Sequence, residues 1–277
     1  MVEYTNKDLQ KIANEIRLIA LETIERAGSG HIGGSFSLAE IMTVLYFKVM
    51  NIDPADPKLL NRDRLVVSKG HASPIVYSTL AKRGYFPMEK LKEFRQIDGH
   101  FSGHVEMTHV PGVDMSTGSL GQGLSVAVGM ALSSKTYKVN NRIFAITGDG
   151  ELQEGQNWEA AMAAGSFALD NLCLVVDDNK IQLDGRCCEI MKVEPLDKKF
   201  QAFGWHTIKA DGHDVDSLLD AFADAEKADK PVAIIANTVK GKGVSIFEDN
   251  AKWHGSYPSH DEFHKAYEEL RLLLKAM

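Results

Sequence analysis

The chain has 277 residues, of which 44% are apolar and 25% charged, a composition that is ordinary for a soluble globular protein with a full core. Its net charge of -7 argues against a nucleic-acid surface, and no apolar run reaches the length needed to span a bilayer. The amino terminus lacks the basic and apolar regions of a signal peptide, and Cys173, Cys187 and Cys188 have no metal-binding spacing and favour free thiols. We therefore expect a cytoplasmic protein that binds neither nucleic acids nor membranes.

The first predicted element is an amphipathic helix that begins at a capping box. Thr5 and Asp8 have the spacing of such a box, and apolar residues recur on one face of the segment 9–24. The loop predicted at residues 28–34 contains four glycines around His31. Glycines let the backbone pass close to a ligand, although a loop histidine by itself is more often solvated. His31 is therefore a candidate that needs support from other residues.

A second helix is predicted from Ser37 to Val49, and a buried strand is expected at residues 65–68. Gly70 and His71 follow this strand directly, before a helix that is predicted over residues 72–83. A long loop after this helix again combines glycines with histidines.

The loop from Gln96 to Gly118 contains His100, His104 and His109. Loops of this length in compact domains are usually functional or disordered, and the low charge of this one favours function. The helix predicted to begin within residues 118–123 has its glycines in the wrong order for a dinucleotide fingerprint. We therefore expect no NAD site.

A βαβ unit is predicted at the centre of the chain. A strand at residues 142–147 precedes Gly148-Asp149-Gly150, and a helix and a second strand then lead to Asp177-Asp178-Asn179. Asp149 and Asn179 should therefore lie at the carboxyl ends of two parallel strands, where ligands of such sheets bind. Carboxylate, amide and backbone carbonyl oxygens suit Mg²⁺ better than Zn²⁺. Either triplet alone could equally be a tight turn or a cap.

The last third of the chain continues the alternation of strands and helices. A strand and turn are predicted at residues 181–186, and strands at 205–209 and 232–237 flank a helix at 215–227. A loop from Lys240 to Gly255 contains His254, and a helix at 262–274 follows. Since the chain shows no repeat, low-complexity segment or linker, residues 1–277 are predicted to form a single domain.

Seven motifs in this order and spacing resemble the transketolase family over essentially the whole chain. They are Ser29-Gly30-His31, Val67-Ser68-Lys69-Gly70-His71, Gly103-His104-Val105-Glu106, Ser116 to Gly123, Gly148 to Gly155, Asp177 to Ile181 and His254-Gly255. The resemblance implies an α/β thiamin diphosphate-binding fold, a mostly parallel sheet with helices on both faces. It covers only the amino-terminal, diphosphate-binding domain of such an enzyme, so the chain is similar to the amino-terminal subunit of a split transketolase.

The resemblance also implies roles for individual residues. Mg²⁺ would be held by Asp149, Asn179 and the carbonyl of Ile181, and His31 and His104 would contact the hydroxyls of the sugar. The remaining implied contacts are to thiamin diphosphate: His71, Gly150 and His254 at the diphosphate, Gly118 and Leu120 along the cofactor, Asn179 through the metal, and Leu183 on the thiazolium. The catalytic candidates are the histidines His31, His71, His104 and His254.

The implied reaction transfers a two-carbon ketol unit from a ketose phosphate to an aldose phosphate, as in pentose phosphate metabolism. Two departures from the family pattern, Ser119 in place of a proline and Ile32-Gly33-Gly34-Ser35 after the first histidine, remove no ligand. The glutamate that activates the aminopyrimidine belongs to the absent domain. We therefore expect a partner chain that carries the pyrimidine-binding domain, in an α2β2 assembly.

Three other functions are weighed against this one. The α subunit of a 2-oxo acid dehydrogenase is also a separate diphosphate-binding chain, but it has no need of four histidines that face a sugar. A 1-deoxyxylulose-phosphate synthase shares the motif around His31, whereas Leu120-Gly121-Gln122-Gly123 and the short chain argue against it. A non-catalytic, cofactor-binding regulatory subunit would be free to lose His31, His104 or Asn179, and this chain has all three.

Overall fold

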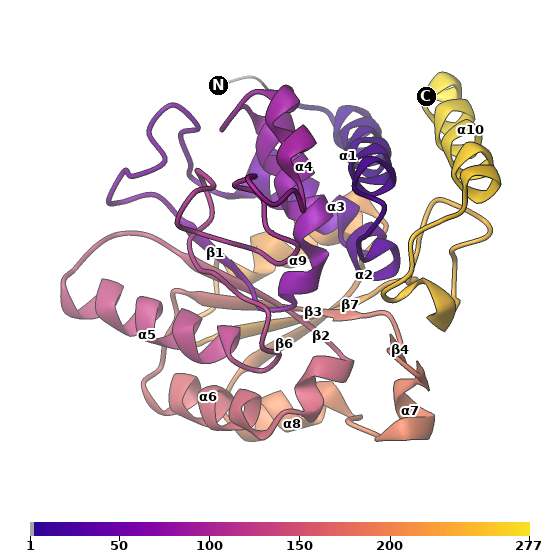
Figure 1. The fold of residues 1–277 in the computed structure, drawn as a ribbon. Coiled ribbons are helices and arrows are strands. Elements are labelled where there is room, and N and C mark those ends of the chain that lie inside the picture. Colours follow the sequence, from indigo (N-terminus) through magenta and orange to yellow (C-terminus); the bar gives the residue numbers. More distant parts are fainter. Residues whose placement is uncertain (1–2) are drawn as a thin grey trace.

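The fold is that of a computed structural model that describes residues 3–277, so Met1 and Val2 lie outside the described residues. Figure 1 shows a sheet between two layers of helices. The strands are β1 (Arg64–Val67), β2 (Ile143–Gly148), β3 (Leu172–Asp178), β4 (Ile181–Gln182), β5 (Gly185–Arg186), β6 (His206–Asp211) and β7 (Val232–Asn237). The α-helices are α1 (Asn6–Ala27), α2 (Ile32–Phe36), α3 (Ala39–Val44), α4 (Ser73–Arg83), α5 (Gly123–Thr136), α6 (Gly155–Ser166), α7 (Cys187–Ile190), α8 (Leu196–Ala202), α9 (Val215–Ala225) and α10 (His260–Ala276).

The main sheet has five strands in the order β1-β2-β3-β7-β6, and all of its neighbouring pairs are parallel. β4 and β5 form a separate antiparallel hairpin. β1 forms one edge of the sheet, and β2 and β3 follow it side by side. β6 forms the opposite edge, and β7, the last strand in sequence, lies between β3 and β6. The polar residues that follow β2, β3 and β7 are therefore brought to one edge of the sheet.

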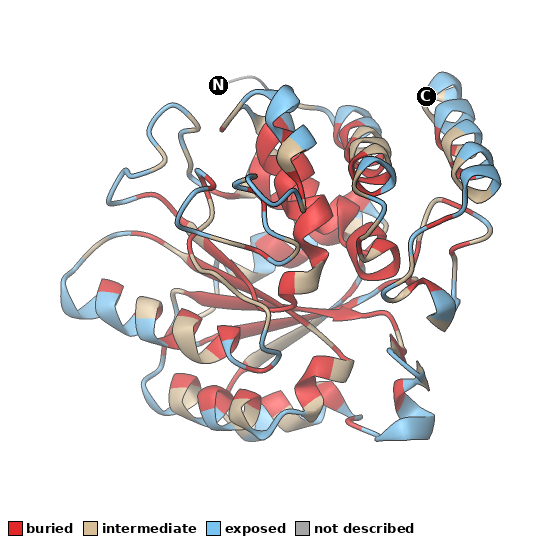
Figure 2. Cartoon of the chain, in the orientation of Figure 1, coloured by how far each residue is buried: buried red, intermediate tan, exposed pale blue. Residues whose placement is uncertain are grey.

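Strand residues alternate between two apolar cores, one on each face of the sheet. In β2, Phe144 and Ile146 join the core under α1 to α4 and α9, whereas Ile143 and Ala145 join the core under α5, α6 and α8. This alternation is the period of two that a strand imposes. β1, β2, β3 and β7 are mostly buried between the layers (Figure 2), whereas the edge strand β6 is largely half-exposed. This arrangement confirms the predicted parallel sheet with helices on both faces.

The first helix follows its prediction closely, and the segment after it does not. Thr5 and Asp8 form the capping box of α1, and Gly28 ends the helix with a φ of 60°. The predicted glycine-rich loop is instead partly helical, because α2 occupies Ile32–Phe36. Its glycine content has a packing cause: a Cβ on Gly33 would lie 2.9 Å from side-chain carbons of Lys240.

Several other boundaries differ from the sequence prediction. The helix predicted from Ser37 continues from α3 into a π-helical turn, Leu45–Val49. α5 begins at Gly123 and not earlier, because Gly121 has a φ of 84° and donates its N–H to the Glu151 carboxylate. The short helices α7 and α8 have no counterpart in the prediction. Within residues 3–277, no helix combines the length and apolar character needed to cross a membrane.

Candidate active site

The carboxyl ends of β2 and β3 form the floor of the candidate site. Gly148 pairs in register with Asp177, so Asp149 and Asn179 follow neighbouring strands, as the βαβ pattern predicts. The two turns are also bonded to each other. The N–H of Asp149 donates to the carbonyl of Asp177, and the N–H of Lys180 donates to Oδ2 of Asp149 at 2.8 Å. The two triplets therefore form one structural unit.

A cavity of about 240 Å³ opens above this floor. It is lined by eight of the residues predicted to form the site: His71, Leu120, Asp149, Gly150, Asn179, Ile181, Leu183 and His254. Leu183 is 60% exposed, which leaves its side chain available for contact with a ligand or a partner. Gly118 lines a second cavity of about 410 Å³ and lies next to His104.

Four histidines from distant parts of the chain form a single cluster. The ring centroid of His31 lies 5.2 Å from that of His71, 5.9 Å from that of His104 and 5.8 Å from that of His254. His71 and His254 lie 5.1 Å apart. All four predicted catalytic histidines are thus brought together, and His71 and His254 line the cavity. Nδ1 of His31 is buried and has no hydrogen-bond partner among residues 3–277.

Burial keeps these imidazoles neutral. It lowers the pKa of His31 to about 4 and that of His254 to about 3, and in both cases neighbouring cations add to the effect. The pKa of His71 is well below its usual value for the same reason, and burial, together with Arg95, lowers the pKa of His104. A neutral imidazole both donates and accepts, so each ring can exchange a proton with a hydroxyl.

The other two histidines of the long loop lie elsewhere. His100 and His109 stack on each other, with ring centroids 4.9 Å apart. Both are exposed, and His109 contacts the carboxylate of Glu106 at 3.2 Å. Of the three loop histidines, only His104 belongs to the cluster, which agrees with the residue-by-residue assignment.

The negative charge of the Asp149 carboxylate is poorly balanced by the protein alone. Burial, followed by the charges of Asp177 and Asp178, raises the pKa of Asp149 to about 6. A bound cation would relieve this repulsion, because it adds positive charge beside the Asp149 carboxylate. Asp149, Asn179 and the Ile181 carbonyl supply only oxygen ligands, the donor set that Mg²⁺ prefers. Residues 3–277 contain no group of three or more His, Cys, Asp or Glu side chains that is suited to a metal.

Asp177 is a buried residue of the site that the sequence interpretation did not assign. Its carboxylate accepts hydrogen bonds from Lys69 Nζ at 2.5 Å, Ser37 Oγ at 2.7 Å and Asn179 Nδ2 at 2.9 Å, and also from the Thr238 hydroxyl. Burial alone would raise the pKa of Asp177, but the adjacent Lys69 ammonium lowers it. The amide nitrogen of Asn179 is held by Asp177, and its oxygen accepts the N–H of Ile181 at 3.1 Å, so the second lone pair of that oxygen remains for a metal.

Lys240 is the second unassigned residue, and it connects two predicted ligands. Its ammonium donates to the carbonyl of Ile181 at 3.0 Å and lies 2.8 Å from Nδ1 of His254. Burial, with the nearby charge of Lys69, lowers the pKa of Lys240 to about 8. The charged form donates to Nδ1 of His254, so the hydrogen of that neutral ring is on Nε2. Only the short run Lys240-Gly241-Lys242-Gly243 marked this segment in the sequence.

Glu151 fastens the loops around the cavity. Its buried carboxylate accepts from Ser68 Oγ at 2.5 Å, from the N–H of Gly121 at 2.9 Å and from the N–H of Gly148 at 3.1 Å. Burial raises the pKa of Glu151 despite these bonds. The carboxylate is therefore a structural link between three glycine-containing loops.

The motifs at this cavity are shared with a known protein family. Residues 8–272 match the family model described as "Transketolase, thiamine diphosphate binding domain". The chain belongs to the transketolase family. This confirms the predicted family, the enzyme class, a transketolase-type transferase, and a domain that binds thiamin diphosphate.

Two relatives of transketolase type have nearly the same length as this chain. The 6-deoxy-6-sulfo-D-fructose transketolase subunit of Clostridium sp. (strain MSTE9) is 47% identical over 264 residues, which cover 95% of this chain and 96% of that protein. The apulose-4-phosphate transketolase subunit of Actinobacillus succinogenes is 42% identical, with coverage of 95% and 96%. The similarity to subunits of split transketolases, predicted from the motifs, is therefore confirmed.

Longer transketolases match this chain with only part of their length. The transketolase of Mus musculus is 41% identical over 262 residues, 92% of this chain and 42% of that protein. The crystal structure of Campylobacter jejuni transketolase has a TM-score of 0.90 and 36% identity, and covers 95% of this chain and 42% of that one. The chain thus spans about two fifths of these enzymes, and its fold is confirmed as the transketolase thiamin diphosphate-binding fold.

Proposed function

We propose that this chain is the diphosphate-binding subunit of a two-chain transketolase, which transfers a two-carbon ketol unit from a ketose to an aldose with thiamin diphosphate and Mg²⁺. The observation that carries the proposal is the cluster of His31, His71, His104 and His254, four neutral imidazoles of which His71 and His254 line the cavity. A 2-oxo acid dehydrogenase would decarboxylate its substrate and has no use for this many groups that pair with hydroxyls.

The cavity residues fit the cofactor and its metal. Asp149, Asn179 and the Ile181 carbonyl would hold Mg²⁺, which offsets the charge of the diphosphate and of the Asp149 carboxylate. His71, His254 and Gly150 would approach the diphosphate. A Cβ at Gly150 would lie 3.0 Å from Cβ of Gln182, so glycine leaves this space open. Leu120, Gly118 and the exposed Leu183 would contact the rest of the cofactor.

The histidines would act on the sugar. The bound cofactor supplies the nucleophilic carbon and the electron sink for cleavage of the C2–C3 bond of the ketose. His31 and His104 accept or return the proton of the hydroxyl at the breaking bond, because both rings are neutral. His254, by contrast, would donate to the diphosphate through Nε2–H, since its Nδ1 already accepts from Lys240.

A second chain is part of this proposal. The similarity of the chain to relatives named as subunits supports a partner that provides the pyrimidine-binding domain, in an α2β2 assembly. We further propose that residues 1–277 form one domain and that the protein is cytoplasmic. The donor and acceptor sugars would be selected together with the partner.

The test is to express the chain with candidate partner chains that match the remainder of a longer transketolase. The complex is assayed with xylulose 5-phosphate or 6-deoxy-6-sulfo-D-fructose as donor and ribose 5-phosphate as acceptor. Pyruvate with an artificial electron acceptor serves as the dehydrogenase control. We expect ketol transfer and no pyruvate oxidation. A complex that oxidises pyruvate, or one that binds thiamin diphosphate and turns over no donor sugar, would contradict the proposal.

A further inference from the structure

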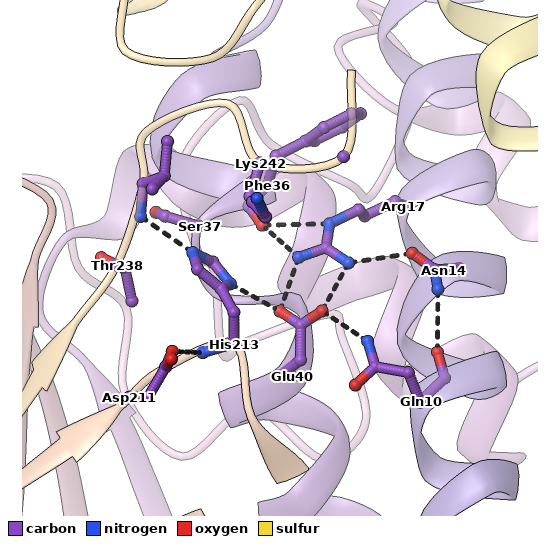
Figure 3. Close-up of polar contacts among 12 residues, drawn as sticks. Gln10, Asn14, Arg17, Phe36, Ser37, Glu40, Asp211, His213, Thr238 and Lys242 are labelled. Carbon is purple, nitrogen blue, oxygen red and sulfur yellow. Dashed lines mark hydrogen bonds and ion pairs between the residues drawn. The ribbon is translucent and has the colours of Figure 1, made fainter. Parts of the chain in front are cut away.

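A buried ionic network lies between α1, α3 and the turn that precedes α9 (Figure 3). Arg17 contacts both carboxylate oxygens of Glu40, at 2.6 and 2.5 Å, and the two side chains are 1% and 2% exposed. Nδ1 of His213 lies 3.0 Å from Oε2 of the same carboxylate. Buried charges of this kind are costly unless each is paired, so the three side chains form one unit.

The hydrogen-bond directions fix the state of the His213 ring. Arg17 lowers the pKa of Glu40 to about 2 although burial acts in the opposite direction, so the carboxylate is ionised and accepts from Nδ1–H of His213. On the other side of the ring, the backbone N–H of Val239 donates to Nε2 at 2.8 Å. Only the neutral ring with its hydrogen on Nδ1 satisfies both contacts.

The bond to Val239 reaches the segment that carries Lys240. We call residues 238–243, which directly follow β7, the Lys240 arm. The arm is also bonded to α2, because the N–H of Gly241 donates to the carbonyl of Gly33 at 3.0 Å. Arg17 reaches the same short helix from the other side through the carbonyl of Phe36, at 3.3 and 3.2 Å.

We propose that His213 is a positioning residue, which together with Glu40 and Arg17 places the Lys240 arm so that the Lys240 ammonium meets the Ile181 carbonyl and Nδ1 of His254. This inference rests on the proposed function, since it concerns the same site. His213 contacts neither of these groups and acts only through the Val239 N–H.

Two substitutions test the two hydrogen bonds of the His213 ring one at a time. His213→Asn keeps a donor near the position of Nδ1 for Glu40 but has no acceptor that reaches Val239. His213→Gln places its amide oxygen near the position of Nε2 and can still accept from Val239. His206→Ala is the matched control, because His206 also pairs with a carboxylate, Asp224 at 3.1 Å, but lies on the edge strand β6.

The first readout is the tautomer of His254, measured from the ¹⁵N shifts of its ring in the chain without cofactor. In wild type we expect a single Nε2–H form. His213→Asn should give a mixture of tautomers, whereas His213→Gln and His206→Ala should keep the wild-type signal. A His213→Asn chain with a lower Tm and an unchanged His254 tautomer would overturn the proposal, because that is the result of a purely structural role.

The second readout is the Kd of thiamin diphosphate with Mg²⁺, measured by calorimetry. His213→Asn should raise the Kd about tenfold, and in a Lys240→Met background the same change should add little, because both act on one contact. Fully additive effects would contradict the inference. If the wild-type chain and its complex bound no thiamin diphosphate, the proposed function would fail, while the His254 tautomer would still decide the role of His213.

Discussion

At the histidine cluster, burial removes positive charge from groups that are usually half protonated near neutral pH. Within the cluster, His71 and His254 line the cavity, and His31 lies next to both of them and to His104. The cluster therefore consists of two rings that line the cavity and two that do not.

We predict that His31→Ala and His104→Ala in the two-chain enzyme retain thiamin diphosphate and lose about 10²-fold or more in kcat, the scale of a lost acid–base contact. Single-turnover kinetics and cofactor stoichiometry measure the two effects separately. His100→Ala, in the exposed pair, is the control and should have wild-type kcat. Loss of cofactor with normal turnover per occupied site would show that His31 or His104 does not face the sugar.

Asp149 should make the metal-free chain less stable above about pH 6. Its pKa is higher in the folded chain than the ordinary 3.8, so its contribution to stability is complete below pH 3.8 and is lost as the pH rises through about 6. Asp149→Asn should therefore raise the free energy of unfolding at pH 7.5 by up to about 3 kcal/mol, and at pH 5 by about half of that amount.

Urea unfolding in the presence of a chelator measures this difference, with Asp220→Asn on the exposed side of α9 as control. The same Asp149→Asn chain should lose Mg²⁺-dependent retention of thiamin diphosphate. The prediction is wrong if the variant is less stable than wild type at pH 7.5, or if it retains the cofactor with normal affinity.

At the scale of residues, the sequence was informative where a site residue stands in a short recognisable motif. Asp149, Asn179 and the four histidines stand in short motifs, and the structure brings them together. Asp177, Lys240 and His213 were not assigned, because their roles depend on partners far away in sequence. His213, for example, meets Glu40 at a separation of 173 residues.

At the scale of elements, α2 shows how packing can override local propensity. Its glycines predicted a loop. Gly33 instead lies in a helix that packs against Lys240 and the carbonyl of Trp253, where a larger residue would not fit. The start of α5 was misplaced for a related reason, since Gly121 is held by the distant Glu151. Strands and long helices were predicted well because their periodicity is a local property.

We predict that Gly33→Ala weakens cofactor binding by displacing the Lys240 arm. The new Cβ would lie 2.9 Å from Cε and Cγ of Lys240 and 2.9 Å from the carbonyl oxygen of Trp253, and that carbonyl cannot move without its loop. The expected cost is about 1–3 kcal/mol in unfolding free energy, together with a higher Kd for thiamin diphosphate.

Gly129→Ala is the matched control for this helix substitution. Gly129 lies within α5, and a Cβ there meets nothing within 4 Å, so the change should stabilise the chain by about 0.5–1 kcal/mol. Denaturant unfolding and calorimetry on both variants give the comparison. Equal cofactor affinity in the two variants would show that α2 does not position the Lys240 arm.

At the scale of the whole molecule, this chain leaves apolar side chains uncovered around the candidate cofactor cavity. Leu183, Ile190 and Met191 are 60%, 45% and 59% exposed beside the cavity, and Leu120 is 37% exposed. Apolar groups gathered at a ligand site commonly mark a surface that a partner covers.

We predict that the isolated chain with saturating thiamin diphosphate and Mg²⁺ has no ketol-transfer activity, because the family resemblance assigns the glutamate that activates the aminopyrimidine to the partner's pyrimidine-binding domain. Glu151, the buried candidate, is occupied by Ser68, Gly121 and Gly148. The assay uses a preparation whose mass shows this chain alone, and adding the partner should restore turnover. Substantial activity without a partner would refute the two-chain enzyme.

The return of β7 into the middle of the sheet also has a consequence for synthesis on the ribosome. β3 and β6 are made before residues 232–237, yet β7 lies between them in the finished sheet. Until that segment emerges, a nascent chain carries two strands with unpaired facing edges, which can pair with other nascent chains. A pause in translation before residue 232 therefore exposes an aggregation-prone edge that the completed protein does not have.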